Sequence, residues 1–248
     1  RDAAFALAAR GHTVYASTFS DEQADALRLQ CKTRGMALNV FRMDITSEAD
    51  RAQINALTLD VLINNAGIGE SGSLAEVDMA RIRRVFEVNL FGTLALTQLA
   101  LKPMIARGSG TVLFVSSIAG RVPMPFLMPY SMTKFALSAA GAGLRAEMDQ
   151  LGRNIQIALI EPGAIHTGFN QAMSNTKYDW MGPDSYFYAQ ASQMKAKEDR
   201  TFRFLEARST DSIVARIVTA SEARRPRLRY VAPWIQGVMI RIARIFGA

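Results

Sequence analysis

Short apolar segments alternate along this chain with amphipathic segments long enough to form helices. Residues 61–63, 111–115 and 155–160 are mostly apolar and rich in Val, Ile and Leu, which is typical of strands buried on both faces. Helical patterns at 79–107 and 130–151 lie between these runs. Two parallel strands need a connection of helix length, so the alternation predicts an α/β fold with a doubly wound parallel sheet between two layers of helices.

The rest of the chain extends this pattern. Gly11 and Gly35 are typical of helix C-termini, Asp21 is a candidate N-cap, and Ser47 begins a capping-box pattern. Residues 164–208 look irregular and amphipathic. Further helices are expected at 1–10, 21–34, from 47, 210–224 and from 233, and further strands at 12–17, 38–43 and 228–231.

Length and composition favour one globular domain. The chain has 248 residues, of which 49% are hydrophobic, so it can bury a full core, and no Gly-, Ser- or Pro-rich linker divides it. A single cysteine, Cys31, excludes an internal disulfide and suits a reducing compartment. No apolar run approaches the length of a membrane span and no secretory signal is visible, so we expect a cytoplasmic protein.

The positive charge is concentrated near the end of the sequence. From Arg200 onward there are ten arginines and three acids, which together equal the net charge of +7 of the whole chain. A basic groove over the whole domain, such as a nucleic-acid enzyme needs, is therefore not indicated. The pattern predicts one local basic surface and no nucleic-acid partner.

Three polar side chains in the middle of the chain are placed for proton transfer. Tyr130 and Lys134 stand four residues apart in a predicted helix that begins near Pro129, so they share one face. Ser117 follows the strand at 111–115 and lies at its carboxyl end, where open α/β sheets bind ligands. A phenol, an ammonium and a hydroxyl that meet there can protonate a carbonyl or deprotonate an alcohol. A Tyr/Lys pair on a solvated helix face is the ordinary alternative.

A second group of candidates is predicted at the same edge of the sheet. Asn64-Asn65-Ala66-Gly67 follows the strand at 61–63, and its small residues let a flat or charged ligand approach the backbone. Its asparagines can tie neighbouring strands by side-chain hydrogen bonds. The alternative interpretation of these four residues is a plain turn of the Asn-Gly type that binds no ligand. Asp44 ends the strand at 38–43, where its carboxylate either accepts a hydrogen bond from an adenine amino group or caps the next helix.

Together these residues resemble the motifs of the short-chain dehydrogenase/reductase family. Their order matches the family over nearly the whole chain, with 28 residues from Asn89 to Ser117 and 13 from Ser117 to Tyr130. The resemblance implies one NAD(P)-binding domain of the Rossmann type over residues 1–248. The matching residues are Asp44-Ile45, Asn64-Asn65-Ala66-Gly67, Val88-Asn89-Leu90, Ser117, Tyr130 with Lys134, and Pro162-Gly163 with Thr167.

The resemblance also implies a reaction and a role for each residue. A hydride would pass between a nicotinamide cofactor and an alcohol or carbonyl carbon, with Tyr130 as the acid/base. Lys134 would lower the pKa of this phenol from its ordinary value of about 10 and would hold the nicotinamide ribose. Ser117 would bind the substrate oxygen, and Asn89 would hold a water molecule that links Lys134 to solvent. No metal would take part. The cofactor would contact Asp44, Ile45, Asn65, Ala66, Gly67, Tyr130, Lys134, Pro162, Gly163, Ile165 and Thr167.

The sequence departs from the family pattern in two places. The family's first, central strand and its glycine-rich loop have no counterpart from Arg1 onward, so we expect a natural chain that begins about 10–25 residues earlier. Without that strand, two strand edges would be open. After the strand at 12–17, Thr18 and Phe19 stand where an acid would select NAD or an arginine NADP. Because the acid is absent, we expect NADP, with NAD as the alternative.

Two segments in the second half of the chain concern the substrate and partners. Residues 164–208 occupy the place of the family's substrate lid, and their aromatic and Met side chains predict a hydrophobic substrate, although such residues more often form ordinary core. The residues 227–234 are similar to the hydroxysteroid and retinol dehydrogenase-like branch. The amphipathic helix at 233–248 ends with Arg241 and Arg244. It either packs on its own domain, lies on an anionic membrane, covers the substrate mouth or packs on a partner subunit.

We therefore predict an NADP-preferring oxidoreductase for a hydrophobic secondary alcohol or ketone. Two alternatives stay open: an NAD-dependent dehydrogenase of a polar alcohol, and a non-catalytic NAD(P)-binding sensor or scaffold. The combination of Asn89, Ser117, Tyr130 and Lys134 weighs against the sensor, because a pure binder has no need of a proton-handling phenol. The resemblance also implies a homodimer or homotetramer.

Overall fold

The strands of the protein are parallel and form two sheets. In the computed structural model, which describes residues 1–246, β1 pairs with β2, and the other sheet has the order β3-β4-β5-β6. Residues 247–248 of the predicted C-terminal segment lie outside the described residues. The strands are β1 (Tyr15–Thr18), β2 (Asn39–Arg42), β3 (Val61–Asn64), β4 (Ser109–Val115), β5 (Asn154–Pro162) and β6 (Arg229–Ala232).

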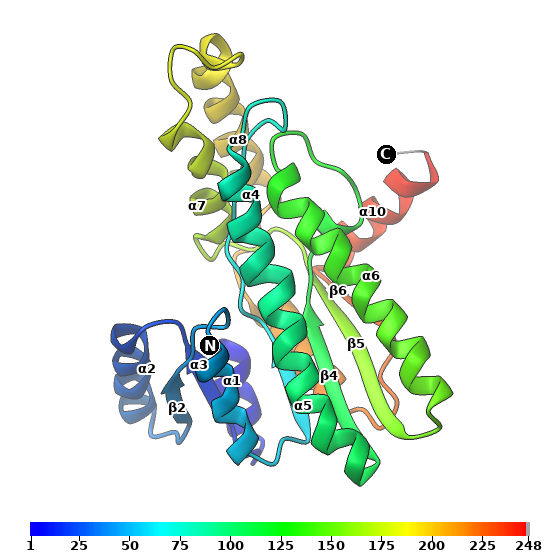
Figure 1. The fold of residues 1–248 in the computed structure, drawn as a ribbon. Helices are drawn as coiled ribbons and strands as arrows, with labels where there is room; N and C mark the ends of the chain where they lie inside the picture. Colours follow the sequence, from blue (N-terminus) through cyan, green and yellow to red (C-terminus); the bar gives the residue numbers. More distant parts are fainter. Residues whose placement is uncertain (247–248) are drawn as a thin grey trace.

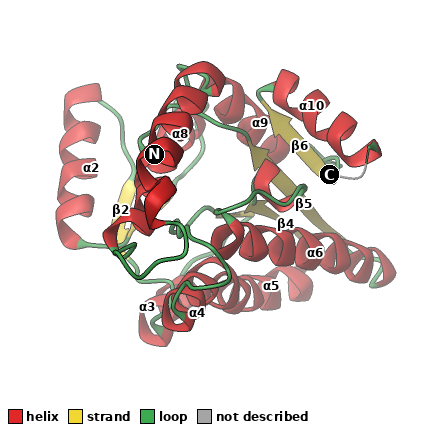
Figure 2. Ribbon diagram, turned by 90° about the horizontal axis from the view of Figure 1, so that it is seen from above, coloured by secondary structure: helices red, strands yellow, loops and turns green. Residues whose placement is uncertain are grey.

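Helices cover both faces of the larger sheet, as the alternation of the sequence predicts. On one face, α5 packs on β3 and β4, and α6 packs on β5 (Figure 1). On the other face, α9 packs on β4, β5 and β6, and α1 packs on α9. Figure 2 shows α9 and α10 on the side of the strands opposite α5 and α6. The helices are α1 (Asp2–Ala8), α2 (Asp21–Arg34), α3 (Glu48–Ala52), α4 (Met79–Phe86), α5 (Thr93–Arg107), α6 (Met128–Gln150), α7 (Phe169–Asn175), α8 (Ala191–Leu205), α9 (Asp211–Glu222) and α10 (Trp234–Ile245). The predicted three-layer α/β fold is confirmed.

The division into two sheets leaves open strand edges. In the described part of the chain, β1 is hydrogen-bonded to β2 and to no other strand, and β3 is bonded only to β4. This agrees with the expectation of two open edges in this region of the fold. Val61 and Ile63 on β3 are accordingly only half-buried, whereas Val112 and Phe114 on the central strand β4 are fully buried.

Local side-chain chemistry explains where several helices begin and end. Ser20, not Asp21, caps α2: its hydroxyl accepts a hydrogen bond from Gln23 N at 3.3 Å, and Asp21 is the first helical residue, where its charge suits the helix dipole. Gly35 ends the same helix with φ 61°, as predicted. Ser47 caps α3 in the predicted manner.

The long helical stretch Met79–Arg107 is a core element. It consists of α4, a π-helical turn (Glu87–Gly92) and α5. By length and composition it could cross a membrane, so the expectation that no apolar run approaches that length is wrong. Half of its most apolar window is buried in the fold, where α5 packs on the sheet and α4 on α6. Such burial is what the core helix of a globular domain shows.

The segment 164–208 contains regular helices, contrary to the expectation of an irregular region. It folds into α7, two short 3-10 turns and α8, and α7 packs on α8 (Figure 1). Met194, Phe202 and Leu205 of α8 are partly buried on one side of the helix, whereas Phe204, on another side, is 87% exposed. An apolar residue outside the partly buried side makes the helical period less regular in the sequence.

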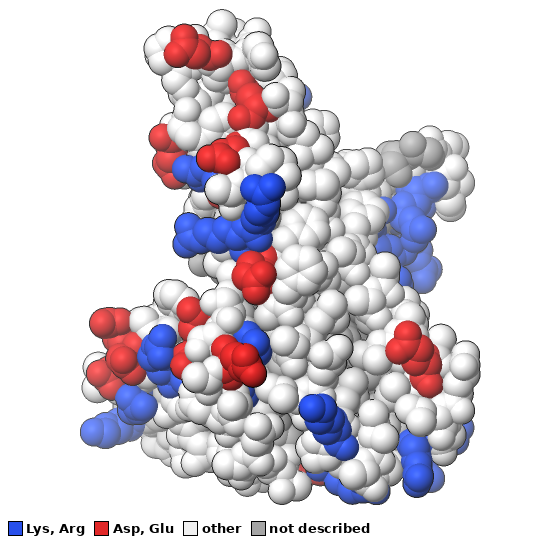
Figure 3. Space-filling model, viewed as in Figure 1, with Lys and Arg blue, Asp and Glu red and all other residues white. Residues whose placement is uncertain are grey.

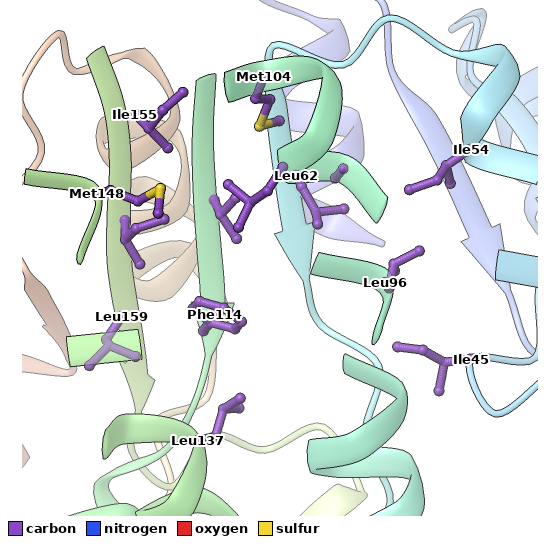
Figure 4. Close-up of a cluster of buried hydrophobic side chains, with 14 of the residues drawn as sticks. Ile45, Ile54, Leu62, Leu96, Met104, Phe114, Leu137, Met148, Ile155 and Leu159 are labelled. Carbon is purple, nitrogen blue, oxygen red and sulfur yellow. The ribbon is translucent and has the colours of Figure 1, made fainter. Parts of the chain in front are cut away.

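The main core lies between the sheet and the α5/α6 layer (Figure 4). Phe114, Ile157 and Leu159 from β4 and β5 are fully buried there, and Leu137 of α6 and Met104 of α5 pack against the same cluster. At about 25 cal/mol per Å² of apolar surface, side chains of this size each contribute on the order of 2 kcal/mol. This core holds the carboxyl ends of β4 and β5 beside the start of α6.

Gly141 sets how closely α6 approaches the sheet. A Cβ at this position would lie 2.7 Å from Leu159 Cδ2 and 3.2 Å from Phe114 Cδ2, and both side chains are fully buried. We expect Gly141→Ala to lower the free energy of unfolding by about 1–3 kcal/mol through overpacking, despite the better helix propensity of alanine.

Gly143 on the same helix is the matched control, because no atom lies within 4 Å of its added Cβ. Gly143→Ala should raise the free energy of unfolding by about 0.5–1 kcal/mol. Urea unfolding of both variants measures these changes. Effects of the same sign at Gly141 and Gly143 would contradict the packing argument.

Candidate active site

Tyr130 and Lys134 lie together at the buried beginning of α6. Pro129 occupies the first turn of the helix, and the side chains of Tyr130 and Lys134, one turn apart, point to the same side. Lys134 Nζ lies 5.6 Å from the centre of the Tyr130 ring. The two residues are only 6% and 4% exposed, so the alternative of a solvated helix face does not apply.

Lys134 is held by the carboxyl end of β4. Its Nζ donates a hydrogen bond to Val115 O at 2.9 Å. Burial lowers the pKa of Lys134 to about 8, because a desolvated ammonium is costly. Val115 was not predicted as part of the site, since a main-chain carbonyl leaves no signal in the sequence.

The phenol of Tyr130 does not have the lowered pKa that the resemblance implies. Burial raises the pKa of Tyr130 to about 12, and a hydrogen bond with the Ser117 side chain offsets only part of this. The physical reason is that the phenolate would be desolvated, while the Lys134 ammonium is itself buried and is bonded to Val115. The phenol is therefore protonated at neutral pH.

Ser117 lies where β4 ends, as predicted. It caps a short 3-10 turn, Ile118–Gly120, and its hydroxyl accepts a hydrogen bond from Ala119 N at 3.1 Å. The same hydroxyl lies 3.4 Å from Pro162 O on β5 and donates a weak hydrogen bond to it. These contacts orient the Ser117 side chain toward the phenol.

Asn89 lies in the π-helical turn between α4 and α5 and is fully buried. Its Nδ2 donates to Ile68 O at 2.9 Å and to Thr133 Oγ1 at 3.1 Å, and its Oδ1 accepts from Ile68 N at 2.8 Å. The side-chain amide therefore binds protein atoms and joins the loop after β3 to α6. Asn89 is a positioning residue in this structure, and the predicted water relay stays a prediction.

The motif Asn64–Gly67 has two structural functions. Asn64 ties β3 to α5 and not to a neighbouring strand: its Nδ2 donates to Thr97 Oγ1 at 2.9 Å. Gly67 leaves room beside the buried side chains of Asn89 and Lys134. A Cβ at this position would lie 3.3 Å from Asn89 Oδ1 and 3.7 Å from Lys134 Nζ. A larger residue at this position would fill the space next to the ammonium.

Asp44 closes a turn before α3. Its Oδ1 accepts hydrogen bonds from the backbone N of Thr46 at 2.9 Å and from its hydroxyl at 2.8 Å. The Thr46 backbone N–H is the main cause of the lowered pKa of Asp44. Ser47, not Asp44, caps α3, so the expected helix cap is not at Asp44, and the contact of Asp44 with an adenine amino group stays a prediction. Ile45, the next residue, is buried in the main core.

One cavity of about 950 Å³ brings most of the predicted residues together. Within residues 1–246, its wall does not include Asp44, Ile45, Ala66 or Asn89. The predicted residues that line it are Asn65, Gly67, Ser117, Tyr130, Lys134, Pro162, Gly163, Ile165 and Thr167. The apolar part of its wall includes Met124, Phe126, Leu127, Phe169, Met173, Met194, Phe202, Leu205, Ile213, Met239 and Ile240. Met173 packs directly on Tyr130 and Ala119.

Gln236 of α10 is a site residue that sequence reasoning missed. It is buried, its Oε1 accepts from Ala164 N at 2.7 Å, and its Nε2 donates to Leu205 O at 2.9 Å. A Cβ on Gly163 would collide with its amide oxygen. Gln236 thus joins α10, α8 and the end of β5 at the cavity wall. A lone uncharged polar residue near the start of a helix with a broad apolar face was the available signal.

A buried ion pair in the segment 164–208 was also missed. Lys177 is fully buried, and its Nζ donates to Glu198 Oε2 at 2.9 Å and to Ser174 O at 2.6 Å. The hydroxyl of Tyr178 donates to the same carboxylate oxygen at 3.0 Å. Burial lowers the pKa of Lys177. Ser174 and Glu198 line the cavity, so α7 and α8 present a polar patch on its otherwise apolar wall.

The residues present fit the nicotinamide and ribose half of a dinucleotide. The space beside Gly67 is open to the cavity, and Lys134 offers an ammonium next to it. Pro162-Gly163 and Thr167 form the facing wall. This donor set combines a cation, small residues and hydroxyls, which suits ribose hydroxyls and a flat amide-bearing ring.

Comparisons with known proteins show which sequences and folds this chain is similar to. The chain is 30% identical to bovine retinol dehydrogenase 8 over 203 residues, which are 79% of this chain and 64% of that protein. Other curated relatives match over 112 residues, or 34% of their length. The chain therefore spans about a third to two thirds of the length of the curated relatives that it matches.

Solved structures share the fold at lower sequence identity. A short-chain dehydrogenase from Sphingobium yanoikuyae in complex with NADPH has a TM-score of 0.71 and 20% identity, covering 99% of this chain and 90% of that one. One from Burkholderia phymatum in complex with NAD has a TM-score of 0.78 and 19% identity, covering 98% and 88%. The family model described as short chain dehydrogenase matches residues 1–178. With this match over most of its length, the chain belongs to the short-chain dehydrogenase/reductase family.

Proposed function

We propose that this protein is an NADP-preferring oxidoreductase that interconverts a hydrophobic secondary alcohol and a ketone. The observation that carries the proposal is the meeting of Ser117, Tyr130 and Lys134 in one cavity whose wall is otherwise mostly apolar. The family supports a dehydrogenase or reductase in general terms. Residues 164–208, with α7 and α8, serve as the lid over the substrate.

Tyr130 acts as the proton donor and acceptor of the reaction. A nicotinamide cofactor, when bound, supplies or takes up the hydride. Lys134 would hold its ribose, and Gly67, Gly163 and Thr167, which line the same cavity, would hold its ring. Ser117 and the Tyr130 hydroxyl bind the substrate oxygen, and the phenol gives its proton to that oxygen in the direction of carbonyl reduction. The raised pKa of Tyr130, about 12, supports this direction because it keeps the phenol protonated at neutral pH.

The pH dependence of carbonyl reduction follows from Lys134. When Tyr130 gives up its proton, the nearby ammonium stabilises the phenolate; the pKa of Lys134 is about 8, so the ammonium is present below that pH and is lost above it. We expect kcat/KM for reduction to fall as the pH rises through about 8. Lys134→Arg keeps its charge in this range, so its profile should be flat there. A wild-type profile that is equally flat would contradict the role of Lys134.

The cofactor preference rests on the residues at the end of β1. Thr18, the last residue of β1, and Phe19, which follows it, carry no carboxylate, and Thr18 Oγ1 donates to Ser20 O at 3.1 Å. The repulsion that would exclude a 2′-phosphate is absent from these two positions. We expect kcat/KM to be at least about tenfold higher with NADPH than with NADH, a difference of roughly 1.4 kcal/mol.

Assays of the full-length protein with a panel of ketones and aldehydes test the proposed function. We expect turnover of NADPH with apolar ketones and a lower kcat/KM for short polar ones, because the cavity wall is mostly apolar. Binding of NADPH without turnover of any carbonyl, and of NAD(P) without oxidation of any alcohol, would contradict an enzyme and favour a sensor or scaffold.

A second candidate is an NAD-dependent dehydrogenase of a polar alcohol. Two observations favour it: Ser174 and Glu198 place polar groups on the cavity wall, and Asp21 and Glu22 stand in the first turn of α2, just after the end of β1. A higher kcat/KM with NAD and a polar alcohol than with NADPH and an apolar ketone would identify this alternative.

A further inference from the structure

The last helix, α10, leaves a broad apolar face uncovered. Six of its residues are 44–77% exposed, and they fall within one arc of the helix. Its opposite side, with Gln236 and Gly237, packs on β6 and the cavity wall. Packing on its own domain, one of the predicted alternatives, therefore accounts for only half of this helix. The six residues, here called the apolar face, are Trp234, Ile235, Val238, Met239, Ile242 and Ile245.

The charge beside this face has one sign. Arg241 and Arg244 are exposed on α10, and the sequence Trp234–Ile245 contains no acid. Figure 3 shows basic side chains over α10, and the nearest acidic side chains in this view lie below this basic patch. An apolar arc with a tryptophan at its start and arginines at its margin is the composition of helices that lie in a membrane interface.

The apolar face adjoins the mouth of the substrate cavity. Met239 belongs to both, since it lines the cavity and is 51% exposed. Gln236 and Ile240, one turn away, line the cavity from the inner side of the same helix. Whatever covers the apolar face of α10 therefore lies at the entrance to the cavity.

Charge distinguishes a membrane from a second copy of the chain. In a twofold contact through α10, the same surface meets itself, so Arg241 and Arg244 would meet a helix that carries the same two cations and no acid to pair with them. Like charges placed together in this way disfavour association. An anionic lipid surface instead offers negative headgroups to the arginines and an apolar layer to Trp234.

We propose that α10 docks on the surface of an anionic membrane and places the mouth of the cavity at the lipid. The docking stands independently of the enzyme reaction. Entry of an apolar substrate from the bilayer into the cavity, the second part of the proposal, rests on the proposed function. This arrangement gives Arg241 and Arg244 a role in attraction to the membrane. Neither arginine belongs to the proposed catalytic site.

Sedimentation with lipid vesicles tests the docking. The full-length protein should bind vesicles of phosphatidylcholine containing about one third phosphatidylserine, and should bind pure phosphatidylcholine at least about tenfold more weakly. Binding should weaken as salt rises from about 0.1 M to about 1 M, where the screening length falls from about 10 Å to about 3 Å. Equal binding to both vesicles, or none to either, would overturn the proposal.

Matched variants separate α10 from general exposure of apolar residues. Ile242→Asp and the double variant Arg241→Glu/Arg244→Glu should each lower vesicle binding about tenfold or more, whereas Leu29→Asp on α2 should not, although Leu29 is more exposed than Ile242. Turnover of a water-soluble carbonyl and the circular dichroism spectrum should stay unchanged in all three. A dimer that Ile242→Asp disrupts, seen without lipid by ultracentrifugation, would show a partner subunit in place of the membrane.

Vesicle binding needs no turnover, so a failure of the docking is distinguishable from a failure of the proposed reaction. If the wild type binds anionic vesicles but turns over no carbonyl or alcohol, the docking stands and the proposed function fails. If turnover of an apolar ketone occurs and vesicle binding does not, only the docking fails. Substrate entry from lipid is supported if anionic vesicles loaded with an apolar ketone raise the turnover rate in the wild type but not in Ile242→Asp.

Discussion

Tyr130→Phe is expected to lower kcat for carbonyl reduction by about 10²–10⁴-fold while NADPH binding is retained. The substitution removes the one hydroxyl that can pass a proton to the substrate oxygen and keeps the ring, which packs on Met173 and Ala119. The fold and the cofactor contacts should therefore survive. Stopped-flow measurement of hydride transfer, with NADPH binding followed by fluorescence, separates the loss of chemistry from a loss of binding.

Tyr230→Phe is the matched control for this experiment. Tyr230 is also buried, but its hydroxyl accepts a hydrogen bond from Arg227 N and lies on β6, outside the cavity wall within the described residues. The same atom is removed, so kcat should be unchanged. If both variants lost activity equally, or if Tyr130→Phe kept its full rate, Tyr130 would not be the proton donor.

Glu161→Ala is expected to lower the free energy of unfolding by about 3–5 kcal/mol. Glu161 on β5 is fully buried and holds two guanidinium groups: Arg121 donates to its Oε2 at 2.9 Å, and Arg229 of β6 donates to its Oε1. Removing the carboxylate leaves two partly buried cations beside each other without a counter-charge. Urea unfolding followed by circular dichroism measures the change.

Asp25→Asn is the control for burial. Asp25 and Arg28 also form a close ion pair, at 2.7 Å, but both side chains are largely exposed on α2. Exposed pairs of this kind contribute little to stability, because water already solvates both charges. A loss in Glu161→Ala no larger than that in Asp25→Asn would contradict the claim that Glu161 is a structural anchor. Because Glu161 directly precedes Pro162 and Gly163, its loss should also disturb the cavity wall.

Sequence reasoning succeeded where the determinants are local. The apolar runs and the helix-length segments between them predicted the parallel strands, because burial on both faces and the length of a crossover are properties of short segments. The spacing of Tyr130 and Lys134 placed both on one side of α6. The position of Ser117 after β4 placed it at the correct edge of the sheet. These are consequences of helix and strand periodicity alone.

Sequence reasoning failed where a residue had two chemically sensible partners. Asp44 suited either an adenine amino group or the cap of the next helix, but its carboxylate bonds to Thr46 in a turn and Ser47 caps α3. For the Tyr130 phenol, the charge of Lys134 favours a lowered pKa and burial favours a raised one. Burial dominated instead, and burial is set by side chains from the lid, such as Met173, that are far away in the sequence.

By itself, the sequence determined the alternation of strands and helices, the family, and the identity of the three side chains, Ser117, Tyr130 and Lys134, to which we assign the reaction. Only the tertiary structure decided what surrounds them. Gln236 reaches Ala164 across 72 residues, and Lys177 and Glu198 pair only because α7 packs on α8. It also decided that one face of α10 stays uncovered. Local patterns record which faces are apolar, but which face is buried depends on packing between elements distant in the chain.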